Sequence, residues 1–246
     1  MRASTAAALG IAAYLVFLAA SVPAGFVARQ IENPGVQVSE ARGTLWNGSA
    51  RLEVALPAGA LTVNELAWHF LPARLISGRV AFAVHVRSPG DGELEIARGF
   101  GGWEARGLAW KGDAADLAAL SPLVATWRPQ GQLDITAPQL AWNGREARGS
   151  ARLEWRDAAV ALADVHPLGT YRLDVEAAGG PAKIALATLD GVLKASGTGT
   201  LDAQGHLAFQ GEARGEGPSA GALEPLLDLL GRRRPDGAHA LDWRAP

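Results

Sequence analysis

The sequence predicts a mainly β protein of antiparallel sheets, with one apolar helix at the N-terminus and a short helix near the C-terminus. Three observations support this prediction: apolar and polar residues alternate with a period of two, glycine-containing turns separate the alternating stretches, and the first segment carries no charge. The alternation leaves three architectures open, namely a curved open sheet, a sandwich and a barrel-like closure. It also leaves open whether the chain contains two similar sub-units.

The first segment, from Ala3 to Ala28, has no charged residue and lies between Arg2 and Arg29. As a helix it would be about 39 Å long at about 1.5 Å per residue, enough for a hydrocarbon core about 30 Å thick. We therefore expect residues 1–30 to form a membrane anchor and residues 31–246 to form one tethered β domain. Because the densest apolar part is short, a signal peptide cleaved near Pro23 is the alternative.

Alternation is clearest in residues 80–87, where every second residue is apolar: Val80, Phe82, Val84 and Val86. The stretches 50–56, 171–176 and 207–212 alternate in the same way. One apolar and one polar face per strand is typical of antiparallel sheets, whereas parallel strands covered on both faces are apolar throughout. The pattern therefore predicts antiparallel pairing.

Two Trp-Asn-Gly sequences, at 46–48 and 142–144, follow strand-like stretches and predict hairpin turns, because Asn-Gly suits the left-handed backbone of a type I′ turn. Beside them the sequence Gly-Ser-Ala-Arg-Leu-Glu occurs twice, at 48–53 and at 149–154. This repeat indicates a duplicated sheet-forming unit covering about 35–137 and 138–246. A continuous series of similar hairpins is the alternative.

Two stretches of the domain have helical spacing, 113–124 and 219–231. In the first, we expect Asp113 to cap the helix and Pro122 to end it. In the second, we expect Ser219 to be the cap and Gly231 the stop, with leucines at helical spacing between them: Leu223, Leu226, Leu227 and Leu230.

Composition excludes several kinds of chemistry. The chain has no cysteine, which rules out a disulfide framework, a thiolate zinc site and a cysteine nucleophile. Its 23 Lys and Arg residues against 25 Asp and Glu residues give no electrostatic basis for nucleic-acid binding. The five histidines have no helical i,i+4 partner among themselves, so we expect structural or surface roles for them: His69, His85, His166, His206 and His239.

The remaining motifs also favour structural interpretations. Glu93 and Glu95 share one face of a predicted strand and are expected to be solvated. Gly-Phe-Gly-Gly at 99–102 is expected to be a turn or bulge, since no Gly-Lys-Ser/Thr follows it. Arg-Arg-Arg at 232–234 is expected to be solvated, with anionic lipid or an acidic partner as the alternative. We therefore expect no enzyme, cofactor or metal.

Several segments resemble one family when they are taken in order after the apolar first segment. They are VSEARGTLWNG at 38–48, HPLGTYRL at 166–173, FQGEA at 209–213 and LLDLLGRRRPDG at 226–237. The sequence is similar to the type II secretion system protein N family, also called general secretion pathway protein N. This sequence departs from the family pattern at RRRPDG, residues 232–237, where its basic insert is longer than the pattern leads us to expect. The resemblance does not assign a binding role to any individual residue of this sequence.

The resemblance implies a bacterial inner-membrane protein with a single membrane pass and its main domain in the periplasm. It implies a non-catalytic accessory part of the apparatus that exports folded proteins through an outer-membrane secretin. Its partners would be other inner-membrane and periplasmic secretion components, reached through sheet edges or an exposed sheet face. The alternative is a periplasmic lipid-binding or bridging protein whose curved sheet forms an apolar groove.

The candidate structural or partner-contact residues come from the two Trp-Asn-Gly sequences and from the C-terminal helix. They are Trp46, Asn47, Gly48, Trp142, Asn143, Gly144, Leu227 and Leu230. If the rings of Trp46 and Trp142 are buried, we expect their truncation to cost roughly 3–5 kcal/mol of stability.

Overall fold

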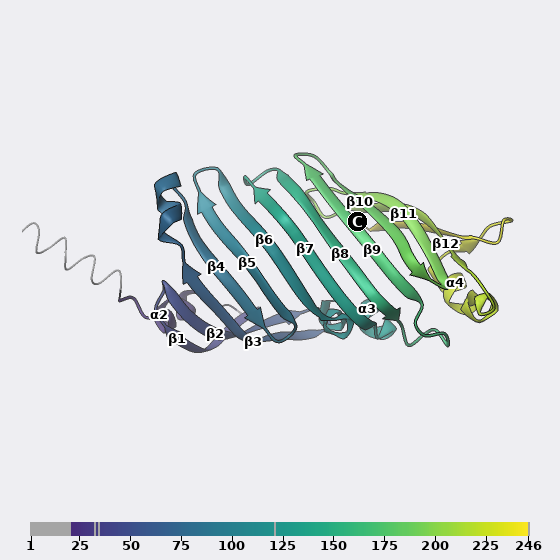
Figure 1. Ribbon diagram of the computed structural model, residues 1–246, viewed down its shortest axis with the longest axis horizontal. Helices are drawn as coiled ribbons and strands as arrows, with labels where there is room; N and C mark the ends of the chain where they lie inside the picture. The colour runs from purple at the N-terminus through teal and green to yellow at the C-terminus, as the bar shows by residue number, and fades with distance from the viewer. Residues whose placement is uncertain (1–20, 32, 34, 121, 246) are drawn as a thin grey trace, which may run out of the picture.

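The computed structural model describes residues 21–245, apart from 32, 34 and 121. Its strands form one open antiparallel sheet of 14 strands, so the open-sheet alternative is confirmed over the sandwich and the barrel (Figure 1). Most of the predicted anchor, residues 1–20, lies outside the described residues. Among the residues that are described, no helix is long and apolar enough to cross a membrane.

Successive strands are neighbours in the sheet, except that β14 lies between β12 and β13. The strands are β1 (Val36–Gly43), β2 (Asn47–Leu56), β3 (Gly59–Phe70), β4 (Val80–Arg87), β5 (Asp91–Gly99), β6 (Gly102–Asp113), β7 (Gln130–Trp142), β8 (Ala147–Ala159), β9 (Gly169–Ala178), β10 (Ala182–Gly191), β11 (Leu193–Leu201), β12 (Leu207–Gly215), β13 (Arg232–Arg233) and β14 (His239–Ala245). The α-helices are α2 (Ala24–Ile31), α3 (Pro122–Trp127) and α4 (Glu224–Leu230), and the 3₁₀ helices are η1 (Pro72–Ser77), η2 (Ala114–Leu120) and η3 (Ala220–Leu223).

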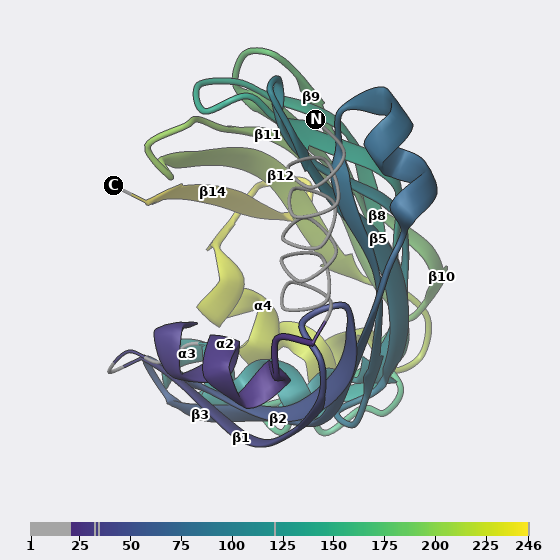
Figure 2. The ribbon, with the colours of Figure 1, turned by 90° about the vertical axis from the view of Figure 1, so that its left-hand side faces the viewer.

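The register places the large apolar residues of neighbouring strands on one face. Val84 of β4, for example, lies opposite Trp68 of β3 and Leu94 of β5, while its neighbour His85 lies opposite Ala67 and Glu93 on the other face. Figure 2 shows the sheet curving around α3 and α4, with η1 outside the curve. Because α4 packs on the apolar side chains, the apolar face is the concave face and the polar face is the convex face.

The best-packed core lies at the C-terminal end of the sheet, beneath η3 and α4. Leu227 is 1% exposed and contacts a cluster that includes Phe209 and Leu241. Leu223 and Leu226 are buried in the same cluster, and Leu230 packs against its edge. The helical spacing of these leucines is therefore confirmed, and Gly231 follows α4 with its N–H donating to the Leu227 carbonyl at 3.0 Å.

Two expectations about helix ends were wrong. Pro122 begins α3 instead of ending the preceding helix, because proline lacks an N–H and fits the first turn, where that group has no partner within the helix. The predicted cap Ser219 makes no side-chain capping hydrogen bond, since a 3₁₀ helix, η3, precedes α4.

The two Trp-Asn-Gly sequences have different structures: β1 and β2 do form a hairpin, but the predicted turn at Asn47 and Gly48 was wrong. Asn47 and Gly48 are already in β2, and the turn is at residues 44–46. Gly48 is needed there for close packing, since an added Cβ would lie 2.5 Å from the Arg42 carbonyl oxygen. In the second sequence Asn143 does start a hairpin loop, and its side-chain oxygen accepts from the N–H groups of Arg145 and Glu146 at 2.9 and 2.8 Å.

The repeated hexapeptide lies in β2 and in β8, and both copies place alanine and leucine on the concave face. The residues in question are Ala50 and Leu52 in the first copy and Ala151 and Leu153 in the second. The sheet is continuous across the proposed boundary at 137–138, which lies within β7. Duplication of a unit of this size stays a prediction.

Two leucines of α4 provide a matched test of where the core lies. Leu227→Ala should lower the free energy of unfolding by about 2–5 kcal/mol, because the site is fully enclosed. Leu229→Ala should change it by less than about 0.5 kcal/mol, because Leu229 is 61% exposed. Urea unfolding followed by tryptophan fluorescence measures both, and equal losses would contradict this placement of α4.

Candidate functional site

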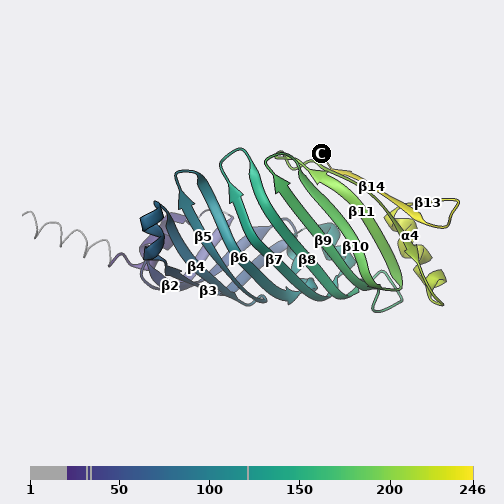
Figure 3. The ribbon, with the colours of Figure 1, turned by 45° about the horizontal axis from the view of Figure 1, so that its top comes forward.

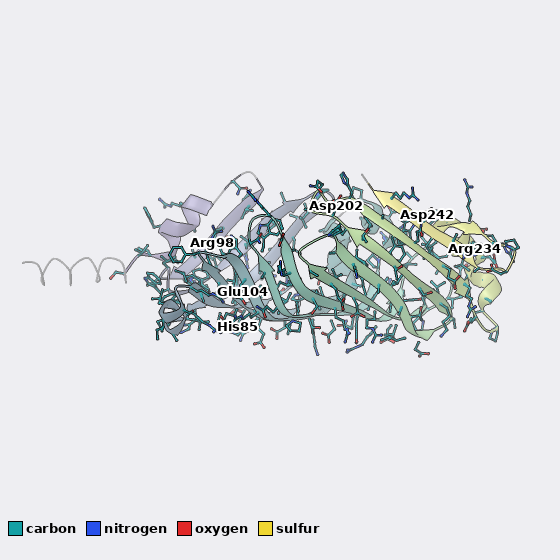
Figure 4. The ribbon with its side chains drawn as sticks, turned by 90° about the horizontal axis from the view of Figure 1, so that it is seen from above. His85, Arg98, Glu104, Asp202, Arg234 and Asp242 are labelled. Carbon is teal, nitrogen blue, oxygen red and sulfur yellow. The ribbon has the colours of Figure 1, made fainter. Side chains whose placement is uncertain are left out.

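Within the described part of the chain, ionisable side chains come together on the convex face and beside α4. Figure 4 shows His85, Arg98 and Glu104 on the N-terminal half of the sheet, and Asp202, Arg234 and Asp242 on the C-terminal half. These groups do not converge on one centre. Each cluster therefore has to be judged by its own geometry.

Glu104 of β6 is the buried carboxylate of the convex face, at 8% exposure. One of its oxygens accepts from Arg106 Nε at 2.6 Å and from Gln139 Nε2 at 2.5 Å, and the other accepts from Arg79. Both oxygens are thus occupied by donors from β6, β7 and the segment before β4. This arrangement links the segment before β4 with β6 and β7.

A second pair holds η1 on the convex face. Arg74 of η1 forms an ion pair with Glu95 of β5, with an Nε–Oε1 distance of 2.8 Å, and its Nη2 donates a hydrogen bond to Oε2 at 2.9 Å. The hydrogen bond and the charge of Glu95 raise the pKa of Arg74, so the guanidinium stays protonated. Glu93, in contrast, is exposed and lies 3.8 Å from His85 Nδ1. The two glutamates therefore have different partners: Glu95 is held by Arg74, and Glu93 faces His85.

The convex face is hollowed over β7–β12 and β14, where a depression of about 1080 Å³ lies above the strands. Charges of both signs line it, and Arg152 Nε donates to Asp174 at 2.7 Å across β8 and β9. This hydrogen bond raises the pKa of Arg152. Because the charges pair within the sheet, the depression shows no preference for an anionic or a cationic ligand.

His239 lies beside two carboxylates of α4 in the arrangement closest to a metal site. Its Nε2 atom is 3.0 Å from Asp228 Oδ1 and 3.9 Å from Glu224 Oε2, and the side chain is fully buried. A histidine that binds a metal usually donates its other ring N–H to an acceptor. Here Nδ1 is buried without a partner, and Arg233 lies 3.4 Å from Glu224. The geometry therefore favours a tautomer whose Nε2–H donates to Asp228, tying α4 to β14.

The sequence did not reveal this role of His239, which we expected to be one of several scattered histidines. The usable signal is the spacing of Glu224 and Asp228, which are four residues apart and so share one face of α4. The sequence does not show that this face of α4 packs against β14, because β14 pairs with β12 only after a long connection between the two strands.

Tyr171 of β9 is the other buried polar side chain that decides local packing. Its hydroxyl donates to the Leu193 carbonyl at 2.9 Å inside the C-terminal core. Burial raises the pKa of this hydroxyl well above its ordinary value. Tyr171 is therefore a neutral hydrogen-bond donor in the folded protein.

The structure places the predicted candidate residues in three separate regions. Trp46 packs edge-on against Phe70 with ring centroids 4.7 Å apart. Trp142 is 40% exposed and lies opposite Trp103 of β6. Asn47, Gly48, Asn143 and Gly144 take the backbone positions described above, while Leu227 and Leu230 belong to the C-terminal core. Their roles in partner contact stay predictions.

Taken together, the chain is a single-layer antiparallel sheet with one apolar face and with charged clusters that are paired internally. A protein-family model, described as type II secretion system (T2SS), protein N, matches residues 34–242. The chain belongs to this family, which confirms the resemblance found in the sequence. No match is found among curated proteins or among solved structures. Membership implies an accessory component of type II secretion that is located in the cell envelope and interacts with other components of the system.

Substitutions at Asp228 test the proposed tautomer of His239. Asp228→Ala should cost about 1–3 kcal/mol of stability, because the buried Nε2–H loses its acceptor. Asp228→Asn should cost less, because the amide oxygen can still accept this hydrogen bond. Thermal unfolding with zinc added and with a chelator added completes the test, and we expect the same midpoint in both. A midpoint that rises with zinc in the unaltered chain and not in Asp228→Ala would instead indicate a metal site.

The raised pKa of Tyr171 predicts that the stability of the protein depends on pH in the alkaline range. Its pKa is raised in the folded state, so the unfolded chain loses the proton first, near pH 10. The contribution of Tyr171 to the free energy of unfolding is fully present below about pH 10 and is lost as the pH rises above that value. Urea unfolding between pH 8 and 11 should show this decline in the unaltered chain and a smaller one in Tyr171→Phe. Parallel pH profiles for the two proteins would show that Tyr171 does not carry the effect.

Proposed function

We propose that the chain is a non-catalytic accessory component of the type II secretion system that acts through protein–protein contacts of a periplasmic β domain. In this proposal residues 1–30 form a single membrane pass in the inner membrane, and residues 31–246 lie in the periplasm. The family match over residues 34–242 is the observation that carries the proposal, since it covers nearly the whole sheet. The internal pairing of Glu104, Arg152 and His239 supports a role without catalysis.

The sheet edges offer a physical route to partners. Among the described residues β1 pairs only with β2, and β13 covers only Ala240 and His239 of β14 (Figure 3). From Leu241 onward β14 therefore has a single neighbour, β12. An edge of this kind exposes unpaired backbone N–H and C=O groups, to which a strand of another protein can bind.

The two edges are not equally accessible. At the β1 edge, α2 packs against β1. The segment leading into α2 also binds the adjoining turn, since the Leu45 N–H donates to the Val22 carbonyl at 2.9 Å and Pro23 bridges to Thr44. At β14, the outer edge from Leu241 onward has no second neighbour among the described strands, and Asp242 and Arg244 are exposed there. We therefore assign the outer half of β14 as the contact for a secretion partner.

Cysteine crosslinking in cells can test this assignment without background, because the chain has no cysteine. With Arg244→Cys on the edge strand, a thiol-reactive crosslinker should capture a type II secretion component. The control is Arg152→Cys on the central strand β8, which is exposed on the same face. We expect at least about five times more secretion component at the edge position. Equal capture at the two positions would exclude the β14 edge as the contact.

Deletion of the gene tests the function itself. Export of the type II substrates should fall in the deletion strain and recover when the full chain is supplied. If export stays normal in a strain that clearly lacks the protein, the accessory role is wrong for that strain.

A further inference from the structure

The two halves of the sheet differ in how well their apolar face is covered. Between residues 29 and 132, the buried hydrophobic residues of the described chain are all alanines, namely Ala50, Ala81, Ala97 and Ala114. From Leu133 onward the buried set includes leucine, phenylalanine and tyrosine side chains that pack beneath α4. The N-terminal half therefore has an apolar face without a core of large buried side chains.

Large apolar side chains nevertheless fill the concave face of this N-terminal half. Trp68, Val84 and Leu94 form one row across β3, β4 and β5, and Phe70, Phe82 and Ile96 form the next row. All six are partly exposed. Six adjacent and partly exposed large apolar side chains are a candidate binding surface.

The concave face offers no hydrogen bond to a protein partner at these two rows. The indole N–H of Trp68 is already used, since it donates to the carbonyls of Thr44 and Leu45 at 3.2 and 3.0 Å. The indole N–H of Trp110 donates to the Pro89 carbonyl at 3.3 Å. Protein–protein interfaces carry about one hydrogen bond per 100–200 Å², whereas hydrocarbon chains need none. The surface thus suits an acyl chain better than a polypeptide.

The N-terminal half of the sheet, where η2 contacts β3, β6 and β7, begins beside the segment predicted to leave the membrane. α2 and the residues just before it contact β1 and the β1–β2 turn, and they form the last part of the segment predicted as an anchor. The apolar rows of β2–β7 start beside this point. Membrane phospholipid is therefore the apolar ligand nearest to the open end of the surface.

One rim of the surface carries groups suited to the polar part of a lipid. The Arg98 guanidinium lies 4.8 Å from the ring centre of Trp103. Trp103 is 47% exposed and lies opposite Trp142, and Phe100 is fully exposed in the adjoining loop. Tryptophan with a neighbouring cation is typical of positions at the boundary between hydrocarbon and headgroup.

We propose that the concave apolar face of β2–β7 binds the acyl chains of a membrane phospholipid, with Arg98, Trp103 and Trp142 next to its headgroup. The ligand enters from the end of the sheet at β1 and lies across the rows of Trp68 and Phe82. This role goes beyond assembly contacts at the sheet edge and does not depend on them.

Photo-crosslinking in living cells tests the proposal with probes on both faces of the same strands. The photoreactive amino acid p-benzoylphenylalanine is placed in the full chain at Phe82 or Leu94 on the concave face, and at Ala83 or Glu93 on the convex face. After irradiation and purification in detergent, mass spectrometry measures the phospholipid adduct. We expect at least about ten times more adduct at the concave positions. Equal adducts on both faces, adducts only to protein, or none at the concave positions would overturn the proposal.

Native mass spectrometry of purified variants provides an independent readout. The unaltered chain should retain phospholipid, and Val84→Arg should retain at least about ten times less, because a charge is placed in the apolar row. His85→Arg, on the opposite face of the same strand, should retain as much as the unaltered chain. Circular dichroism confirms that each variant is folded before the comparison. Loss of lipid in both folded variants, or in neither, would contradict binding on the concave face.

Discussion

One constraint organises the whole molecule: the strands form an unbroken antiparallel ladder whose register keeps apolar side chains on a single face. A shift of one residue at any pair would move every apolar side chain of a strand to the convex face. The register is adjusted at several pairs by bulges, for instance between Ala50 and Leu52 of β2 and between Glu93 and Glu95 of β5. These irregularities change the bend of the strands and leave the apolar face continuous.

The two ends of this face are completed differently, and that asymmetry underlies the proposed functions. At the C-terminal end η3 and α4 cover the apolar side chains, with His239 and Asp228 joining the helix to the sheet. At the N-terminal end the described residues provide no comparable cover of large side chains. A single curved layer can thus serve as a folded body at one end and as a surface for a hydrocarbon ligand at the other.

The charged residues of the convex face act mainly as links between neighbouring segments. Glu104 joins three donors, and Glu95 holds η1 through Arg74. A single-layer sheet has solvent on its polar face, so such exposed pairs contribute less than buried ones. Glu104 is the exception, because its carboxylate is buried and removal would leave two arginines without a partner.

The sequence by itself determined the antiparallel β class, the faces of individual strands such as 80–87, the leucine face of the C-terminal helix and the family. These features depend on local periodicity and on segments that can be read one at a time. Tertiary structure decided which Trp-Asn-Gly forms a turn, where His239 lies and how the sheet ends. The physical reason is that these depend on close contacts between distant segments: Gly48 with Arg42 and Trp68 across strand pairs, and His239 with a helix that precedes its own strand. The curvature of the sheet, and the lack of large buried apolar side chains between residues 29 and 132 of the described chain, likewise arise only when all strands are assembled.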